Sequence, residues 1–278
     1  MSYSPLRYPG GKTKLAPHIK SIIKRNGLIG CNYYEPYAGG AGVALTLLLD
    51  DYVSSITIND VDFAVYSFWK SITEHNSEFQ RRVLEMPVNM ETWFLQKSIM
   101  SNPEKHTLLD VGLATFFLNR TNRSGILKGG VIGGKNQNGN YKIDARFNKS
   151  NLLPKIQAIG DVQDRINVTN IDASELLVSI DNNETGPSFV YLDPPYYVKG
   201  QGLYRNFYNH DDHCEIRDIL SKVDYDWVVS YDNNEEIKTI YSDYHMIDHS
   251  LNYSAQRKLK GEEVIIYSKG IELPYLNE

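Results

Sequence analysis

The chain has 278 residues, 41% of them hydrophobic, and a formal net charge of −5, so it can bury a substantial core in one large domain or two. Its two cysteines are too few for a disulfide framework, which favours a reducing compartment. No run of about 18 apolar residues occurs, and no basic segment leads into an apolar stretch at the N-terminus, so we expect neither a membrane span nor a secretory signal.

The first motif along the chain is Leu6-Arg7-Tyr8-Pro9-Gly10-Gly11-Lys12-Thr13. It ends like a phosphate-binding loop, but the first glycine of G-x-x-x-x-G-K-[ST] would fall on Leu6, and no strand precedes it. An ATPase is therefore disfavoured. Lys12 needs another partner, and a ligand carboxylate would serve.

A glycine-rich turn follows at Glu35-Pro36-Tyr37-Ala38-Gly39-Gly40-Ala41-Gly42, between a predicted strand and a helix predicted over 43–49. A strand, a glycine turn and a helix N-terminus together let a nucleotide-like ligand approach the backbone. The next predicted strand, 55–58, ends at Asn59-Asp60, about 20 residues after the turn, where an acceptor for ribose hydroxyls is expected. The spacing does not separate a dinucleotide from S-adenosylmethionine.

The middle of the chain is predicted to be helical over 61–100 and 108–118 and then becomes basic. Eight basic residues lie between Asn119 and Lys155 against one acid, Asp144, so this segment carries +7 and the rest of the chain −12. A basic segment on an acidic body is typical of a phosphate-binding surface. Within it, Asn138-Gly139 predicts a hairpin turn flanked by glycine-rich strands, and we expect a mobile hairpin or loop that orders on DNA.

The most informative motif is Asp193-Pro194-Pro195-Tyr196, directly after a strand predicted at 189–192. Two prolines cannot continue a sheet ladder, so the chain must turn at the strand end, where open α/β sheets bind their ligands. A carboxylate, a backbone carbonyl fixed by proline and an aromatic ring suit an exocyclic amino group on a flat base. An isolated motif of this kind could equally be a strand-ending turn.

The remaining residues alternate again, with helices predicted at 210–223 and 235–241 and strands at 227–230, 245–251 and 264–267. This order predicts an α/β fold with a largely parallel, doubly wound sheet, and the last two strands could form an antiparallel edge. His210 and His213 near Cys214 lack further ligands at metal-site spacing, so no metal is expected.

Four motifs occur in one order over nearly the whole chain: Tyr-Pro-Gly-Gly-Lys, Glu-Pro-Tyr-Ala-Gly-Gly, Asn-Asp and Asp-Pro-Pro-Tyr. In this the sequence resembles the Dam-type (D12 class, alpha group) DNA adenine-N6 methyltransferases. The resemblance implies a Rossmann-like, S-adenosylmethionine-dependent catalytic domain formed by 1–62 and 161–278. It also implies an inserted, mostly helical target-recognition domain over 63–160 that carries the hairpin loop. The expected location is the cytoplasm of a bacterial or phage-infected cell.

The implied reaction moves a methyl group from S-adenosylmethionine to N6 of an adenine flipped out of double-stranded DNA. A catalytic role falls on Asp193, Pro194, Pro195 and Tyr196. Tyr196 would stack on the base, while the Asp193 carboxylate and the Pro194 carbonyl accept the amino hydrogens, without a covalent intermediate or a metal. The cofactor contacts implied by the resemblance are Tyr8, Pro9, Gly11, Lys12, Glu35, Pro36, Gly39, Asp60, Asp172, Ala173 and Asp193.

The recognition stretch departs from the family's GATC readers, which carry Leu-Asn-Arg, then Tyr-Asn-Gly-Leu-Cys-Arg and Pro-Phe-Gly. Here Leu118-Asn119-Arg120 matches, but the next part is Arg123-Ser124-Gly125-Ile126-Leu127-Lys128, and residues 143–147 contain no Pro-Phe-Gly. We therefore expect an adenine-containing target other than GATC, with Ile126 as a wedge between bases. The expected DNA contacts are Asn119, Arg120, Arg123, Ser124, Ile126, Lys128 and Lys135.

Two alternatives stay open. One is a methyltransferase that acts on an RNA base or a protein glutamine, since similar motifs serve other planar amino groups. The other is a non-catalytic DNA-binding module on a methyltransferase-like fold, which the intact Asp193 motif, Lys12 and Asp60 disfavour. A restriction endonuclease that cuts the same site is a candidate partner.

Overall fold

The fold is built around a seven-stranded sheet with strand order β3-β2-β1-β4-β5-β7-β6. It is seen in a computed structural model that describes residues 3–8, 11–180, 186–197, 208–249 and 263–274. The pairs among β1 to β5 are parallel, and β7 runs antiparallel between β5 and β6. The strands are β1 (Cys31–Glu35), β2 (Val53–Asn59), β3 (Ile166–Thr169), β4 (Ser188–Leu192), β5 (Asp226–Asp232), β6 (His245–His249) and β7 (Glu263–Tyr267). The predicted doubly wound sheet with an antiparallel edge is confirmed.

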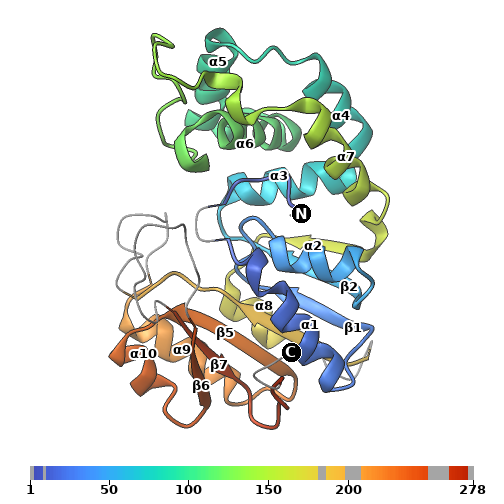
Figure 1. The fold of residues 1–278 in the computed structure, drawn as a ribbon, viewed down its shortest axis with the longest axis vertical. Coiled ribbons are helices and arrows are strands. Elements are labelled where there is room, and N and C mark those ends of the chain that lie inside the picture. Colours follow the sequence, from blue (N-terminus) through green and yellow to red (C-terminus); the bar gives the residue numbers. More distant parts are fainter. Residues whose placement is uncertain (1–2, 9–10, 181–185, 198–207, 250–262, 275–278) are drawn as a thin grey trace.

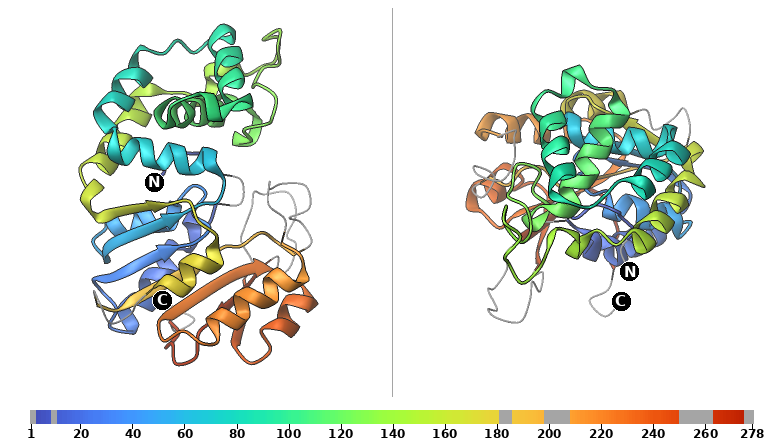
Figure 2. Two further views of the ribbon diagram at one scale, coloured as in Figure 1. Left: turned by 180° about the vertical axis from the view of Figure 1, so that it is seen from behind. Right: turned by 90° about the horizontal axis from the view of Figure 1, so that it is seen from above.

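Helices cover both faces of the sheet, as the alternation of side chains along β4 requires. Phe189 and Tyr191 pack with α1 and α2, whereas Val190 and Leu192 pack with α8, α9 and α10 on the opposite face. Figures 1 and 2 show these two layers from the front and from behind. The helices are α1 (Ala16–Arg25), α2 (Gly42–Leu49), α8 (Ala173–Ser179), α9 (His210–Leu220) and α10 (Glu235–Ile240).

A second group of helices lies above the sheet in Figure 1, between β2 and β3 in the sequence. They are α3 (Phe63–Glu74), α4 (Asn76–Glu85), α5 (Met90–Ser101), α6 (Leu108–Thr121) and α7 (Lys149–Gly160). Helix α6 is buried along most of its length, and a Cβ at Gly112 would lie 2.6 Å from the Ser67 carbonyl, so this glycine allows α3 and α6 to pack closely. Short 3-10 turns connect the elements: η1 (Thr13–Leu15), η2 (Pro103–Lys105), η3 (Arg123–Gly125), η4 (Ile143–Arg146) and η5 (Gln163–Arg165).

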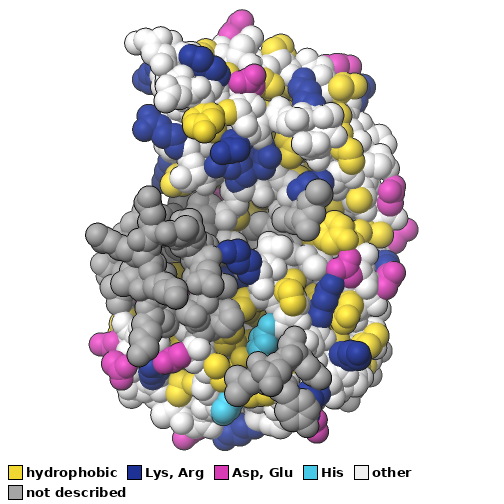
Figure 3. Space-filling view, in the orientation of Figure 1, with side chains coloured by type: hydrophobic (Ala, Val, Ile, Leu, Met, Phe, Trp, Pro, Cys, Tyr) yellow, Lys and Arg dark blue, Asp and Glu magenta, His cyan; other side chains and the backbone are white. Residues whose placement is uncertain are grey.

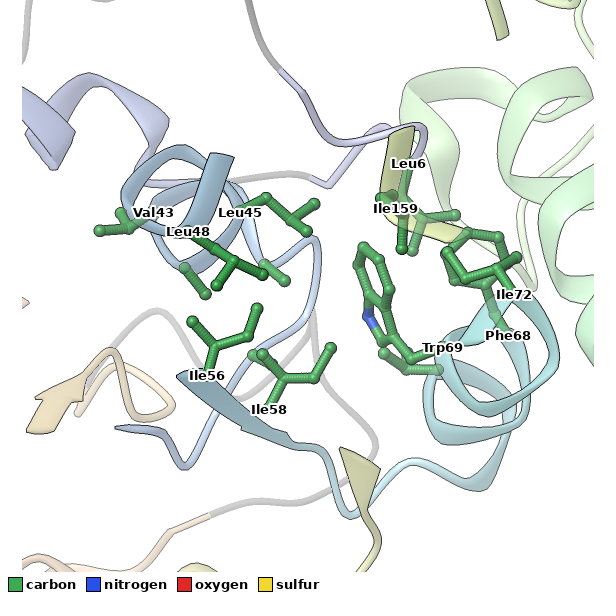
Figure 4. Close-up of a cluster of buried hydrophobic side chains, with 14 of the residues drawn as sticks. Leu6, Val43, Leu45, Leu48, Ile56, Ile58, Phe68, Trp69, Ile72 and Ile159 are labelled. Atoms are coloured by element: carbon green, nitrogen blue, oxygen red, sulfur yellow. The ribbon is translucent and has the colours of Figure 1, made fainter. Parts of the chain in front are cut away.

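Helix α3 joins the helical group to the sheet. Its Trp69 lies between side chains of the sheet layer and those of the helical group, close to Leu6 and Ile159 (Figure 4). The Trp69 indole donates to the Gly39 carbonyl at 2.8 Å, so α3 is also tied to the glycine turn. One continuous apolar core therefore runs from the sheet into the helical group. None of the helices in the described part of the chain combines the length and the apolar character needed to cross a bilayer.

Of the hairpin or loop predicted around Asn138-Gly139, the structure shows the loop. Residues 129–141 form a series of turns, and the β-pairing of this region is a single bridge between Asn122 and Val131. The Gln137 side chain closes the turns by donating to the carbonyls of Ile132 and Gly134 at 2.8 and 2.7 Å. Glycine-rich strands offer few side chains for cross-strand packing, so side-chain hydrogen bonds replace the ladder here.

Candidate active site at the carboxyl edge of the sheet

A pocket of about 230 Å³ lies beside the carboxyl ends of β1 and β4. These neighbouring strands form the switch point of the sheet, where the connections that follow them leave toward opposite faces, and such points bind ligands in open α/β folds. Three predicted motifs line the pocket together, represented by Lys12, Glu35 and Asp193. The structure thus brings the N-terminal motif, the glycine turn and the catalytic motif to one place.

The N-terminal motif lies directly on the glycine turn. A Cβ at Gly39, where φ is +46°, would lie 2.6 Å from the Tyr8 ring, and a Cβ at Gly42 would collide with the Thr13 hydroxyl. The glycines are therefore required both by backbone conformation and by the close approach of a second segment. Tyr8 and Gly11, two of the predicted cofactor contacts, line the pocket, whereas Pro9 lies outside the described residues.

Asp60 shapes the glycine turn from the end of β2. One carboxylate oxygen accepts from the Gly39 backbone N–H and the other from the Asp62 N–H, both at 2.9 Å. Burial of the carboxyl group at the end of β2 raises the pKa of Asp60 to about 7. Part of the residue is still exposed to solvent. The adjacent Asn59 donates to the carbonyls of Pro36 and Ile171 at 3.0 Å, which fixes the ends of β1, β2 and β3 relative to one another.

Glu35 caps helix α2 from the last position of β1. The N-cap residue of α2 is Ala41, which has no side-chain acceptor, and the Glu35 carboxylate accepts from the Ala44 N–H at 2.9 Å instead. The Tyr33 hydroxyl donates to the same oxygen at 2.9 Å. Burial raises the pKa of Glu35 to about 8, because its side chain is only 4% exposed.

Asp193 follows β4 and is held by its neighbours on β5 and in the N-terminal motif. Its Oδ1 accepts from the Ser230 hydroxyl at 3.0 Å and lies 3.5 Å from the Lys12 ammonium. Burial raises the pKa of Asp193 to about 6, while Lys12 lowers it and Glu263 raises it. A quarter of the Asp193 side chain is exposed, so the carboxylate remains open to a ligand.

Tyr196 is anchored at its hydroxyl end by two charged residues. The Lys12 ammonium donates to the Tyr196 oxygen at 2.6 Å and also to Glu263, and the Tyr196 hydroxyl donates to the same Glu263 oxygen at 2.6 Å. Lys12 was expected to bind a ligand carboxylate, and that role stays a prediction. In the structure its ammonium donates to the oxygens of Tyr196 and Glu263. Glu263 was not predicted, because it lies 67 positions after Tyr196 and the sequence marks it only as an acid near the last strand.

Asp172 and Ala173 lie at the start of α8, beyond β3. The exposed Asp172 caps the helix through the Ser174 N–H at 2.8 Å, and Ala173 is buried. Neither lines the pocket, but the neighbouring Asn170 donates to the Asp60 carbonyl at 2.6 Å. Pro194 is buried and Pro195 half buried.

The expected DNA contacts separate into exposed and buried residues. Arg123, Ser124, Ile126, Lys128 and Lys135 are exposed, as a DNA-facing loop requires. The loop is held from below by Asn122, whose amide donates to the carbonyls of Ile126 and Leu127 at 3.0 and 2.9 Å and accepts from the Trp93 indole at 2.7 Å.

Asn119 differs from these residues, because its side chain is only 4% exposed. Its amide oxygen accepts from the Arg7 N–H at 2.7 Å, and its amide nitrogen donates to the carbonyls of Arg7 and Gly125 at 2.8 and 3.1 Å. The residue therefore joins the N-terminal motif to the exposed loop, and its side chain does not face solvent. We expect it to position DNA-contacting residues rather than to touch DNA.

We predict that Asn119→Ala lowers the free energy of unfolding by roughly 2–4 kcal/mol, because three backbone groups lose their partner. Urea unfolding measures this, and Asn138→Ala, at an exposed position of the same segment, is the matched control with an expected change below about 0.5 kcal/mol. Unchanged stability combined with a loss of DNA affinity would show that Asn119 is a direct DNA contact.

Three arginines gather where the N-terminal motif meets α6 and η4. The Arg120 Nε donates to the Arg146 carbonyl at 2.8 Å, and burial together with the charges of Arg7 and Arg146 lowers the pKa of Arg120 to about 10. None of the three forms an ion pair with a carboxylate among the described residues. Figure 3 shows basic side chains gathered over this part of the molecule. Arg7 and Arg146 are not among the DNA contacts predicted from the sequence.

Within the described ranges, no three His, Cys, Asp or Glu side chains gather as a metal site would need.

Comparisons with known proteins place the chain in a family. The model of the D12 class N6 adenine-specific DNA methyltransferase family matches residues 8–255, whereas no curated protein matches. Among solved structures, a conserved hypothetical protein from Streptococcus pyogenes is 11% identical with a TM-score of 0.34, and 91% of this chain and 96% of that chain are covered. A proposed methyltransferase from Escherichia coli, yhhF, is 11% identical with a TM-score of 0.35, and the covered shares are 91% and 84%. At these scores neither structure bears on the assignment. The family match does, and the chain belongs to the D12 class of N6 adenine-specific DNA methyltransferases.

Proposed function

We propose that this methyltransferase acts on an adenine flipped out of double-stranded DNA, at a specific site other than GATC, with S-adenosylmethionine as the methyl donor. The proposal rests on the position of Asp193. It follows β4 directly at the switch point of the sheet, lines the pocket, and is oriented by Ser230 and Lys12. This arrangement suits an amino group that enters beside a bound cofactor.

The residues around the pocket fit S-adenosylmethionine. Lys12, Glu35 and Asp193 place one cation among carboxylates, which suits a ligand that carries a sulfonium and an amino-acid end. Asp60 lies at the end of β2, where ribose hydroxyls would be accepted. Val61 and Ile171, beside it, are among the exposed large apolar side chains and would cover the cofactor's adenine. When bound, the cofactor supplies a methyl group that is reactive toward a nitrogen lone pair.

The catalytic motif would then position the target base. Flipping an adenine costs a few kcal/mol, and stacking on the Tyr196 ring offsets part of that cost. The Asp193 carboxylate and the Pro194 carbonyl would accept the two amino hydrogens, which directs the nitrogen lone pair toward the methyl group. As the bond between this nitrogen and the methyl carbon forms, the bond between that carbon and the sulfonium sulfur would break, with its electron pair left on sulfur. The nitrogen would then be positively charged, and the Asp193 carboxylate would accept the proton that must leave.

The DNA would lie over the helical group. Arg7, Arg120 and Arg146 form a cluster that no carboxylate of the described residues neutralises, and such a cluster suits phosphates. The exposed loop with Arg123, Ser124, Ile126 and Lys128 would read bases. Residues 63–160 would thus act as the target-recognition domain, with Arg7 contributed by the catalytic domain of 1–62 and 161–278. A restriction endonuclease that cuts the same site is a further candidate partner, tested by protection of methylated DNA in host extracts.

The acceptor is tested by a competition assay in which the purified chain and labelled S-adenosylmethionine meet duplex DNA, RNA and protein together. The proposal requires label in DNA. Label confined to RNA or protein would favour the alternative acceptors, and cofactor binding without transfer to any acceptor would favour a non-catalytic DNA-binding module.

Lys128 is expected to read a base in the target site. Lys128→Ala should cost roughly 1–3 kcal/mol on the cognate sequence and relax the choice of base at one position. Lys142→Ala is the control, since Lys142 is exposed but its ammonium donates to the Gln137 carbonyl at 2.6 Å. An equal loss on all sequences would make Lys128 a phosphate contact, and methylation of GATC by the wild type would overturn the specificity claim.

A further inference from the structure

Glu263 is a buried acid that holds the catalytic motif from the far edge of the sheet. It opens β7, is 3% exposed, and is paired in register with Asp232 of β5. The Asp232 carboxylate accepts from the Tyr197 backbone N–H at 3.0 Å, and Glu263 accepts from the Tyr196 hydroxyl at 2.6 Å. Two facing strand residues thus fix consecutive residues of the turn that follows β4.

Lys12 completes this arrangement by donating to both the Tyr196 oxygen and Glu263. The three side chains come from the N-terminal motif, the catalytic motif and the final strand, so their contacts link segments far apart in the sequence. Because hydrogen bonds hold the Tyr196 hydroxyl, the ring cannot rotate freely about its side-chain torsions. The orientation of the Tyr196 ring is therefore determined by Glu263 and Lys12 as well as by the backbone turn.

We propose that Glu263 is a positioning residue of the methyl-transfer reaction, which acts by fixing the Tyr196 ring against which the flipped adenine stacks. The inference rests on the proposed function, because it assigns a base to the Tyr196 ring. The second Glu263 oxygen, Oε2, is buried and has no hydrogen-bond partner among the described residues. A buried carboxylate oxygen without a hydrogen-bond donor lowers the stability of the fold, unless a bound ligand supplies the donor. This agrees with a position of Glu263 in the active site.

The test is a double-mutant cycle of Glu263→Gln and Tyr196→Phe, since both remove parts of the same contact while keeping side-chain size. Each single variant is expected to lower the single-turnover methylation rate about 10–100-fold and to leave the DNA dissociation constant within about twofold. The double variant should be no slower than the slower single variant. Asp248→Asn, an exposed acid on β6, is the matched charge control and should keep the wild-type rate.

Two further measurements separate positioning from a role in folding. With 2-aminopurine in place of the target adenine, both variants should give a larger fluorescence increase on binding than the wild type, because the flipped base is stacked less well. Thermal unfolding reports whether the fold is retained. A normal rate in Tyr196→Phe, additive losses in the double variant, or a rate loss that only follows unfolding would each overturn the proposal, even if Glu263→Gln fails to fold.

The pH dependence adds an independent readout. Asp193 faces Lys12, Glu263 and Glu35, and its Ser230 contact connects it to Tyr191. Burial and Glu263 raise the pKa of Asp193 to about 6, so the wild-type rate should fall as the pH drops through that value. Removing the negative charge in Glu263→Gln should move this fall to lower pH, and an unmoved fall would contradict the proposal. Failure of the proposed function would instead show as absent adenine methylation by the wild type.

Discussion

Asp193→Asn is expected to lower the single-turnover rate of methyl transfer by roughly 10²–10⁴-fold while DNA affinity stays within about twofold. The asparagine keeps the size of the side chain and can still accept from the Ser230 hydroxyl. It loses the negative charge that faces the Lys12 ammonium and that, in the proposed mechanism, would orient the target amino group and take up its proton. The loss should therefore appear in the chemical step and not in DNA binding.

Asp226→Asn is the matched control for this variant. Asp226 is a partly buried carboxylate at the opposite end of β5, where it accepts from the Ser268 hydroxyl at 3.3 Å, and burial raises its pKa as well. It should retain the wild-type rate. Near-wild-type turnover in Asp193→Asn, or equal losses in the two variants, would remove Asp193 from the active site.

The second large effect is expected on DNA binding. Replacing both Arg120 and Arg146 with glutamine should weaken binding to duplex DNA of any sequence roughly 10–100-fold near 0.1 M salt, and should reduce the salt slope of log K by about two. Each arginine would release about one counterion, and neither is neutralised by a described carboxylate. Because burial and like charges lower the pKa of Arg120, its charged form opposes folding, so the variant should be no less stable than the wild type.

Arg81→Gln provides the control from the same helical group, since Arg81 is exposed on α4 and paired with Glu78 and Glu85 at 2.7 and 2.6 Å. Its replacement should change neither the affinity nor the salt slope. An unchanged salt slope in the Arg120 and Arg146 double variant would place the DNA on another face of the molecule.

The carboxylates at the carboxyl edge of the sheet bear an energetic cost that a cationic ligand would relieve. Burial raises the pKa of Glu35 to about 8, of Asp60 to about 7 and of Asp193 to about 6. Groups with raised pKa values destabilise the folded chain when ionised. The penalty is full above about pH 8 and disappears as the pH falls below the ordinary carboxyl range near 4. The proposed S-adenosylmethionine ligand would bring positive charge near these carboxylates and would offset part of this penalty.

Local patterns in the sequence were sufficient to predict the sheet and its motifs. The apolar strand before Asp193 and the turn enforced by its two prolines are local, and the alternation of helices and strands after it predicted the antiparallel edge. The glycine turn was predicted as well. The second reason for a glycine at position 39, its close contact with the Tyr8 ring, was not predicted. That contact depends on how the N-terminal motif packs against the turn.

The remaining features depend on contacts between distant segments. Asn119 and Ser124 are both polar residues in a basic stretch, and only the packing of α6 against the N-terminal motif makes one buried and the other exposed. Glu263 and Arg146 lie outside every motif, and their contacts are with partners on other elements. Of the predicted hairpin or loop, only the loop forms, because the turn signal Asn138-Gly139 gives a hairpin only between pairing strands. Gln137 instead binds the backbone of the glycine-rich segment.

The chemical identity of the methylated product tests most directly whether this chain methylates N6 of adenine in DNA. Duplex DNA treated with the purified chain and methyl-labelled S-adenosylmethionine would be digested to nucleosides and analysed by mass spectrometry. We expect the label in N6-methyl-2′-deoxyadenosine, and we expect sequencing to locate it within one recurring non-GATC sequence. Label on cytosine, or no label in DNA despite cofactor binding, would contradict this expectation.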